Sequence, residues 1–367
     1  MSGENAESGE SGAGRTGFWR RRRVRLTAGW TAGAVALAGG LFWVSGGYDA
    51  WRHDSALDSA CEGDLAAGPV RALVDGAEVT TESAASSRQW WCKVREADDE
   101  EDGVVRLVVS VYRADARGAA VDAEGEDAPL GHGWTGGFSF SPDADEDDRG
   151  EATASVLLDC GKEPGDGLVA SVRARLDSAD FTTAGARTRL TEVLTGTAAS
   201  YARRTGCAAK PGGTVGDPGV SVTSWDYKPF DKVSGACAGV LDAATAARWG
   251  VRTAVESAAG PKPVESCTLG GMQGTRLYAF DAYYGPLVGL KRLDARDAGR
   301  VPADRPNGNY FLTAQCPGAG DTAVYEVSPR VGDRHASPLV LDHGGLRAAL
   351  GRFAAKSAKA HGCEAPK

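Results

Sequence analysis

No cysteine precedes residue 61, although the chain has 367 residues and eight cysteines. The eight include no Cys-x-x-Cys pair and no Cys/His group with zinc-finger spacing, which argues against a metal-binding module. An even number of cysteines confined to one side of the chain is typical of oxidised, structural cysteines in an exported protein. Free thiols and metal ligation are the alternatives.

Charge is missing from residues 26–48, with Arg25 the last charge before this stretch and Asp49 the first after it. At about 1.5 Å rise per residue, such a stretch can cross a hydrocarbon core about 30 Å thick. We therefore predict a single transmembrane helix over 26–48. Because arginines gather just before it, the N-terminus is expected in the cytoplasm and the C-terminal bulk outside the cell.

Two other interpretations of this stretch are open. Ala36-Leu37-Ala38 has the form of a signal-peptidase site, but the apolar run continues to Trp43, which favours a retained anchor. A buried helix of a soluble protein fits the adjoining arginines least well. A lipid-modified cysteine is not expected, because Cys61 is the first cysteine.

Length and charge indicate how the chain divides. Residues 1–25 are predicted to be a disordered cytoplasmic tail, because Ser, Gly, Glu and Ala dominate its first part. Roughly 320 residues follow the anchor, which indicates two domains at about 150 residues each. The net charge of -8 is uneven: residues 232–367 hold 17 basic and 12 acidic side chains, whereas the first exported half is strongly acidic. The predicted division is a first module at 52–207, a Pro/Gly-rich linker at 208–231 and a second module at 232–367.

The cysteine spacing repeats between these halves. Cys61 and Cys92 are 31 residues apart, and their counterparts Cys237 and Cys267 are 30 apart. The last two cysteines of each half are 47 residues apart in both cases, whereas the gap in the middle differs. Each half begins with a short helix-like run and has its second cysteine in a strand-like stretch. More strand-like stretches follow, at 104–112, 154–160 and 168–176 in the first half and at 275–282, 310–316 and 324–327 in the second.

A helix is predicted at the end of each half. Leu190 and Leu346 each begin an apolar 3.6-residue pattern 17 residues before the final cysteine. Gly206 and Gly362 stand directly before that cysteine, where a left-handed glycine closes a helix. The predicted fold is therefore α+β, with two tandem modules that are each an antiparallel sheet with helices on one face.

In the simplest disulfide plan, each of the four bonds joins a helix end to a strand. In the loop-entropy model each bond contributes about 3–5 kcal/mol. Crossed pairings within a half are the alternative. The predicted pairs are Cys61–Cys92, Cys160–Cys207, Cys237–Cys267 and Cys316–Cys363.

These cysteine contexts, Cys237-Ala-Gly-Val-Leu, Trp91-Cys92 and Cys267-Thr268, resemble domains of actinobacterial cell-envelope proteins. The resemblance covers both halves and extends to small cell-wall lipoproteins of unknown function and to the extracellular sensor domain of some receptor Ser/Thr kinases. The chain departs from the first group in lacking a lipid-attachment cysteine. It departs from the second in having 25 residues where a kinase domain would precede the membrane. The resemblance implies an exported binding or sensory module with a cleft between sheet and helix, and it transfers no functional residue.

No sequence motif assigns a reaction. A Gly-x-Ser-x-Gly elbow is absent. Asp333 to His335 and Asp342-His343 are interpreted as surface loops, and no catalytic role is predicted for any histidine: His53, His132, His335, His343 or His361. A hydrolase would need Ser, His and a carboxylate converging in one pocket.

Acidic runs at 96–102, 122–127 and 143–148 invite a calcium hypothesis. The last run has Asp148 where an EF-hand loop needs Gly and Ala154 where it needs Glu, so the motif fails. We interpret the runs as solvated hairpin tips, or as contacts for the basic second module or a cationic partner. No metal and no cofactor is predicted.

Three further groups are interpreted as structural. The glycine-rich loop 131–138 is interpreted as a turn before a strand rather than a phosphate cradle. Core packing is as good an explanation as sugar stacking for most of the aromatic residues Trp90, Trp91, Trp134, Trp225, Tyr283 and Tyr284. A solvated loop is favoured over contact with anionic wall polymers for Lys291, Arg292, Arg296, Arg300 and Arg305.

The sequence thus predicts a single-pass, non-enzymatic binding or sensory protein of the cell envelope, whose partner is a cell-wall polymer or an envelope protein and not nucleic acid. If the protein is a binding protein, we expect a cleft that is lined by aromatic residues and has no converging titratable groups. The alternatives are a wall hydrolase and a scaffold that docks a protein partner, and the scaffold predicts an exposed apolar patch and no cleft.

Overall fold

The structure is a computed structural model that describes residues 56–367 apart from 76, 97–105, 114–126, 141–149, 162–165, 177–178, 222–225, 273–274, 286, 289–307, 319–320 and 330–339. The predicted tail, 1–25, and the predicted anchor, 26–48, lie outside the described residues. Among the helices that the structure does describe, none has the length and apolar character needed to span a bilayer.

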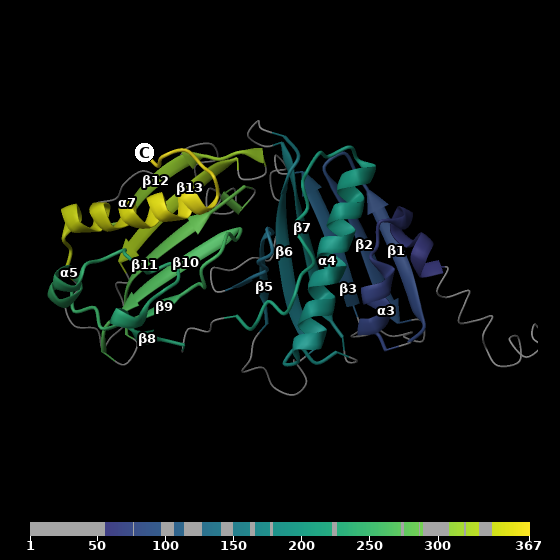
Figure 1. The fold of residues 1–367 in the computed structure, drawn as a ribbon, viewed down its shortest axis with the longest axis horizontal. Helices are drawn as coiled ribbons and strands as arrows, with labels where there is room; N and C mark the ends of the chain where they lie inside the picture. The colour runs from purple at the N-terminus through teal and green to yellow at the C-terminus, as the bar shows by residue number, and fades with distance from the viewer. Residues whose placement is uncertain are drawn as a thin grey trace, which may run out of the picture. The chain divides into compact units, whose positions relative to one another are not determined.

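The fold is α+β with two antiparallel sheets, as predicted (Figure 1). The first sheet has the order β1-β2-β3-β7-β6-β5-β4, with β1 Val79–Ala85, β2 Gln89–Glu96, β3 Arg106–Arg113, β4 Ala128–Pro129, β5 Thr135–Ser139, β6 Glu151–Asp159 and β7 Gly167–Arg175. The second has the order β12-β13-β11-β10-β9-β8, with β8 Lys228–Pro229, β9 Thr253–Glu256, β10 Val264–Gly270, β11 Arg276–Tyr283, β12 Tyr310–Gln315 and β13 Thr322–Pro329.

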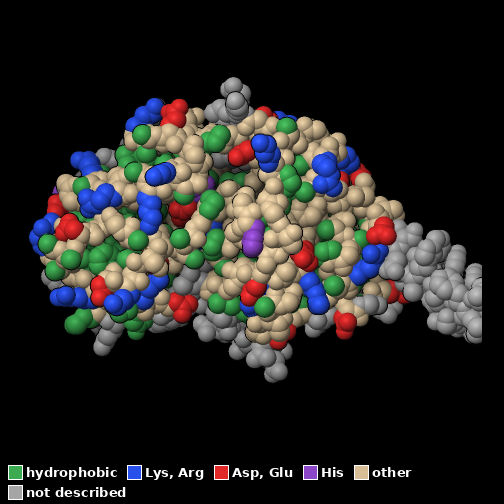
Figure 2. Space-filling view, in the orientation of Figure 1, with side chains coloured by type: hydrophobic (Ala, Val, Ile, Leu, Met, Phe, Trp, Pro, Cys, Tyr) green, Lys and Arg blue, Asp and Glu red, His purple; other side chains and the backbone are tan. Residues whose placement is uncertain are grey.

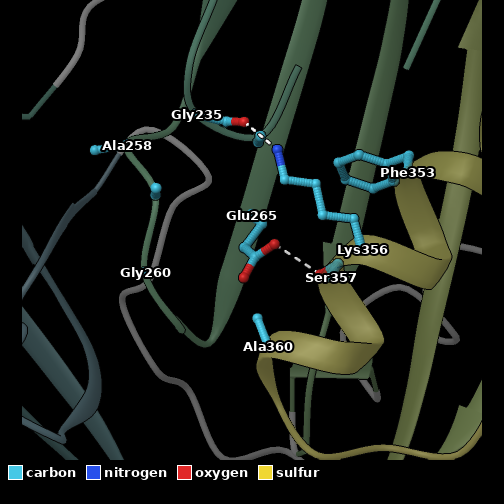
Figure 3. Close-up of a pocket in the computed structure, with 10 residues that line it drawn as sticks. Gly235, Ala258, Gly260, Glu265, Phe353, Lys356, Ser357 and Ala360 are labelled. Atoms are coloured by element: carbon cyan, nitrogen blue, oxygen red, sulfur yellow. Dashed lines mark hydrogen bonds between the residues drawn. The ribbon is translucent and has the colours of Figure 1, made fainter. Parts of the chain in front are cut away.

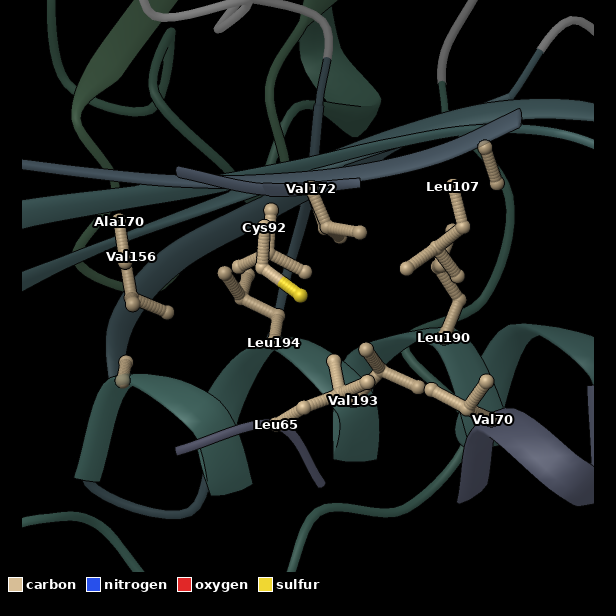
Figure 4. Close-up of a cluster of buried hydrophobic side chains, with 14 of the residues drawn as sticks. Leu65, Val70, Cys92, Leu107, Val156, Ala170, Val172, Leu190, Val193 and Leu194 are labelled. Atoms are coloured by element: carbon tan, nitrogen blue, oxygen red, sulfur yellow. The ribbon is translucent and has the colours of Figure 1, made fainter. Parts of the chain in front are cut away.

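Helices cover the first sheet on one face. Alternate residues of each strand point to that face, because side chains alternate along a strand. Helix α4 (Ala184–Arg204) begins at Thr183, whose hydroxyl accepts the N–H of Ala186. Its apolar side and α3 (Ala67–Leu73) meet the sheet in one buried cluster (Figure 4), which includes Val70, Cys92, Leu107, Val172, Leu190 and Leu194.

The second sheet is covered by α7 (His343–Ala360), and α5 (Ala243–Arg248) precedes β9. Asp342 caps α7 by accepting the N–H of Gly345 at 2.9 Å. Leu346, Leu350 and Phe353 on the inner side of α7 are fully buried against the sheet.

Five strands of each sheet follow the same order, β1-β2-β3-β7-β6 in the first and β9-β10-β11-β13-β12 in the second. The registers agree as well. Starting from the strand cysteine, the paired residues across each sheet are Cys92, Val109, Val172 and Ala154 in the first and Cys267, Phe280, Val327 and Tyr310 in the second. In both sheets the last residue of this row lies six positions before the third cysteine of its half.

The four disulfides are those of the predicted plan: Cys61–Cys92, Cys160–Cys207, Cys237–Cys267 and Cys316–Cys363. The last helix of each half ends in the same cap. Gly206 and Gly362 have φ of +75° and +67°, and the next residue donates its N–H back to the helix, from Cys207 to Ala202 and from Cys363 to Ala358. The final cysteine of each half, directly after this cap, bonds the cysteine that follows β6 or β12.

Strands β1, β8 and β9 were not predicted. Strand β1 is the edge of its sheet with six of its seven residues exposed, so it shows no apolar alternation. Strand β9 has only four residues, too few for a periodic signal. The variable middle of the first half forms β4 and β5, which extend that sheet beyond β6.

The linker contacts the first module along part of its length and is not a bare spacer. The indole N–H of Trp134 donates to the carbonyl of Gly213 at 2.9 Å, and the hydroxyl of Ser221 bonds both backbone groups of Phe140. Val215 is buried in the first core. Composition indicated that the linker has no core of its own, but it carries no signal for these contacts.

The residues after the last disulfide behave differently in the second module. Lys367 and Thr313 exchange two backbone hydrogen bonds, each 2.9 Å long, so the C-terminal residues add to the outer edge of β12. In the first module that edge, the outer side of β6, is occupied by β5.

The two halves also touch. Leu157 and Val169, on the sheet face opposite α4, belong to the buried cluster of the second half. The ammonium of Lys262, which is fully buried, donates to the carbonyl of Asp127 at 2.8 Å.

Candidate ligand site in the second module

A cavity of about 130 Å³ lies between α7, the start of β10 and the segment that joins β9 to β10 (Figure 3). Alanine and glycine dominate its wall. The lining residues are Gly235, Ala236, Ala258, Ala259, Gly260, Glu265, Phe353, Lys356, Ser357 and Ala360. The polar side chains that face it are therefore Glu265, Lys356 and Ser357, and its aromatic wall is the ring of Phe353.

Glu265 lies on the helix-facing side of its strand, because it stands two residues before Cys267. Its side chain is only 10% exposed, so its charge needs partners. Ser357 donates its hydroxyl to Oε2 at 2.6 Å, and His361 Nε2 lies 2.9 Å from Oε1. Both partners come from one face of α7 and its C-terminal cap, four residues apart.

A chain of hydroxyl groups continues behind Glu265. Because Ser357 gives its proton to the carboxylate, the phenol of Tyr284 must donate to Ser357, at 2.6 Å. Tyr325 follows, 3.3 Å from Tyr284. Burial, assisted by the negative charge of Glu265, raises the pKa of Tyr284 well above its usual value. Burial also raises the pKa of Tyr325 to about 12, so both phenols stay protonated and can donate.

Lys356 closes another side of the cavity. Its ammonium donates to the carbonyls of Gly235 and Ala238, at 2.7 and 3.1 Å. Figure 3 shows its side chain reaching from α7 to the carbonyl of Gly235. Backbone oxygens thus hold the lysine charge, and the carboxylate of Glu265 is held by Ser357 and His361 instead.

Ser, His and a carboxylate therefore converge here, which the hydrolase hypothesis requires and the binder hypothesis did not predict. The order of contacts matters for the chemistry. In a Ser-His-Asp triad the histidine stands between the other two and takes the serine proton. Here Glu265 stands in the middle, and the ring of His361 stacks on Tyr284 with centroids 3.6 Å apart. The geometry is that of a carboxylate held by two hydrogen-bond partners and not of a histidine-activated serine.

The other histidines lie elsewhere. His132 is in the turn that ends in the 2.9 Å bond from Trp134 N–H to Gly131, so the glycine-rich loop is a turn, as interpreted. His343 is exposed, but the prediction that Asp342-His343 forms a loop is wrong, because Asp342 caps α7 and His343 is its first residue. His53 and His335 lie outside the described residues.

Core packing accounts for most of the described aromatic residues. Trp90, Trp134 and Tyr284 are buried, whereas Trp91 and Tyr283 are half-buried. Trp225, the basic group from Lys291 to Arg305 and most of the acidic runs lie outside the described residues. Where the structure describes side chains, no three of His, Cys, Asp and Glu lie close enough to hold a metal ion.

The network around Glu265 was not predicted from the sequence. One signal was present: a charged residue at an inward position of a strand, two residues before a buried cysteine. A second was the pair Ser357 and His361, spaced i, i+4 at the end of a helix. That Tyr284 and Tyr325 reach the same point depends on the pairing of β11 with β13, which no local pattern specifies.

No protein-family model matches the chain, and no match was found among curated proteins or solved structures. The resemblance to actinobacterial envelope domains thus stays a prediction from cysteine placement.

Proposed function

We propose that the chain is a membrane-anchored, exported binding or sensory protein of the cell envelope. Four disulfides support an oxidising compartment. The observation that carries the binding function is the carboxylate of Glu265, held by two donors at the wall of a cavity that is otherwise mostly apolar.

This cavity favours a small ligand with a donor group. Each oxygen of Glu265 accepts one hydrogen bond, from Ser357 or from His361, and keeps acceptor capacity for a second. The methyl groups of Ala236 and Ala258 and the ring of Phe353 suit a short apolar body. The ligand class is a small primary amine, such as an amino group carried by an envelope polymer.

Calorimetric titration of the full-length protein in mild detergent tests this proposal, with ethylamine and glucosamine as probes. We expect binding that weakens about tenfold in Glu265→Gln, because the charge that attracts the ammonium is lost. Glu364→Gln, an exposed carboxylate of the same module, is the control and should bind as the parent does. Equal affinity in Glu265→Gln and the parent, or no binding of either amine, would contradict the proposal.

The convergence of Ser357, Glu265 and His361 favours one second candidate, a hydrolase. A fluorophosphonate reagent that labels activated serines separates the two. The binder predicts no labelling, since Ser357 is 3% exposed and bonded to the carboxylate. Labelling that disappears in Ser357→Ala would establish the hydrolase instead.

We also infer that the two modules are copies of one exported unit. Three features support this inference: the shared order of five strands, the matching row across each sheet and the same cap before the final cysteine. Unrelated units would have to acquire all three independently.

A further inference from the structure

A second cavity, of about 400 Å³, lies in the first module. It is found where α4 ends and where the disulfide Cys160–Cys207 joins that helix to the sheet. Its lining residues include Arg88, Arg113, Asp166, Tyr201 and Thr205.

Counting from the cysteines relates residues of this cavity to residues of the network around Glu265. Tyr201 and Ser357 each stand six positions before the final cysteine of their half, and Thr205 and His361 each stand two before it. Arg113 and Tyr284 each stand four positions after the residue that pairs with the strand cysteine.

The same count puts Trp90 where the second module has Glu265, two residues before the strand cysteine. The carboxylate of the second module is thus replaced by an indole in the first, while an arginine replaces a tyrosine. Equivalent positions thus carry side chains of different charge in the two modules.

The arginines reach the cavity from adjacent segments. Arg113 ends β3, and its N–H donates to the carbonyl of Arg88 in the turn between β1 and β2, at 3.2 Å. Tyr201 is held by Trp90, with ring centroids 5.3 Å apart, and burial raises its pKa, so its phenol stays a donor. Asp166 is the negative side chain of the lining.

We propose that this cavity binds a small oxyanion, a carboxylate or a phosphate, between Arg88 and Arg113. A guanidinium group presents a planar fork of donors that matches two oxygens of such a group, and the Tyr201 phenol adds a neutral donor. The site does not depend on Glu265 or on the amine-binding proposal.

Titration of inorganic phosphate and of succinate into the full-length, disulfide-intact protein tests the site. We expect Arg88→Gln and Arg113→Gln each to weaken binding about tenfold, as expected for loss of a charge-assisted hydrogen bond. Arg203→Gln, an exposed arginine of α4 outside the lining, should leave the affinity unchanged. Asp166→Asn should strengthen binding about threefold, because it removes a negative charge beside the anion.

The responses to phosphate and to succinate distinguish the two ligand classes. A phosphate response without a succinate response assigns a phosphoryl ligand, and the reverse assigns a carboxylate. An equal loss in Arg203→Gln, no loss in Arg88→Gln, or no response to either anion overturns the proposal. Arg88 is exposed in a turn, so its variant carries the test if Arg113→Gln fails to fold. Glu265→Gln should leave anion binding unchanged, which keeps this result distinct from that of the amine site.

Discussion

The cavity of the first module lies beside the disulfide Cys160–Cys207 and has Arg88 and Arg113 in its wall, whereas the cavity of the second module has Glu265 in its wall and no cysteine. Five strands of each sheet follow the same order (Figure 1). Tyr201 and Ser357, which stand at equivalent positions of the two last helices, each line a cavity, and the other side chains of the lining decide the charge of that cavity. Figure 2 shows acidic and basic side chains interspersed over one face of the molecule, so total charge alone would not locate either site.

The modules also differ in how they hold their first cysteine. In the second module Glu256 accepts the N–H groups of Ser234 and Cys237, at 2.8 and 2.9 Å, and the ammonium of Lys228 at 2.8 Å. Burial alone would raise the pKa of Glu256, but the Lys228 ammonium and the backbone N–H groups lower it below its usual value. Ser83 occupies the same place opposite the strand cysteine in the first module and is exposed.

The largest expected effect concerns the second disulfide of each module. Replacing both cysteines by serine should cost about 4 kcal/mol in either module, because both bonds close loops of 47 residues. The change is measured by denaturant unfolding, with hydrogen exchange in α4 and α7 to assign it to a module. A loss in Cys160→Ser/Cys207→Ser that differs by several-fold from that in Cys316→Ser/Cys363→Ser would break the equivalence of the modules.

A smaller effect is expected at Glu256. Glu256→Gln should lower the free energy of unfolding by about 2 kcal/mol, because the side chain is 1% exposed and loses its charge-assisted bonds. Ser83→Ala is the matched control and should change stability by less than about 0.5 kcal/mol. Thermal unfolding of both variants measures the difference, and similar losses would show that the first cysteine is held alike in the two modules.

The smallest effect is expected at the contact between Arg187 and the linker. Arg187 donates two hydrogen bonds of 2.7 Å to Asp217 of the linker, and this contact lowers the pKa of the Asp217 carboxyl. The folded pKa lies below the unfolded value, near 3.9, so this stabilisation is complete above that value and is lost as pH falls through the folded pKa. Because Asp217 is 36% exposed, the contribution is only about 1 kcal/mol.

Hydrogen exchange between pH 7 and pH 3 measures this contact. Protection near Val215, expressed relative to the intrinsic exchange rate at each pH, should fall as the pH falls, whereas protection at Lys367 should show no matching fall. Asp217→Asn should raise exchange in the linker already at pH 7 and remove most of its acid dependence. A linker whose protection relative to the intrinsic rate is the same at both pH values would contradict the role given to Arg187.

The elements that the sequence predicted are those marked by strong local signals. Leu190 and Leu346 begin an apolar 3.6-residue pattern, and Gly206 and Gly362 close the helices at the expected positions. Strand β1 was missed because its sheet-edge residues are polar and exposed. The cluster around Glu265 was missed because its members come from three strands and a helix that only the tertiary fold brings together.

Each half forms one unit whose two disulfide bonds both lie within that half. Mass spectrometry of the full-length protein, digested without reduction, tests this directly. It should find four linked pairs, Cys61–Cys92, Cys160–Cys207, Cys237–Cys267 and Cys316–Cys363. A peptide that joins a sulfur between residues 61 and 207 to one between 237 and 363 would contradict the account.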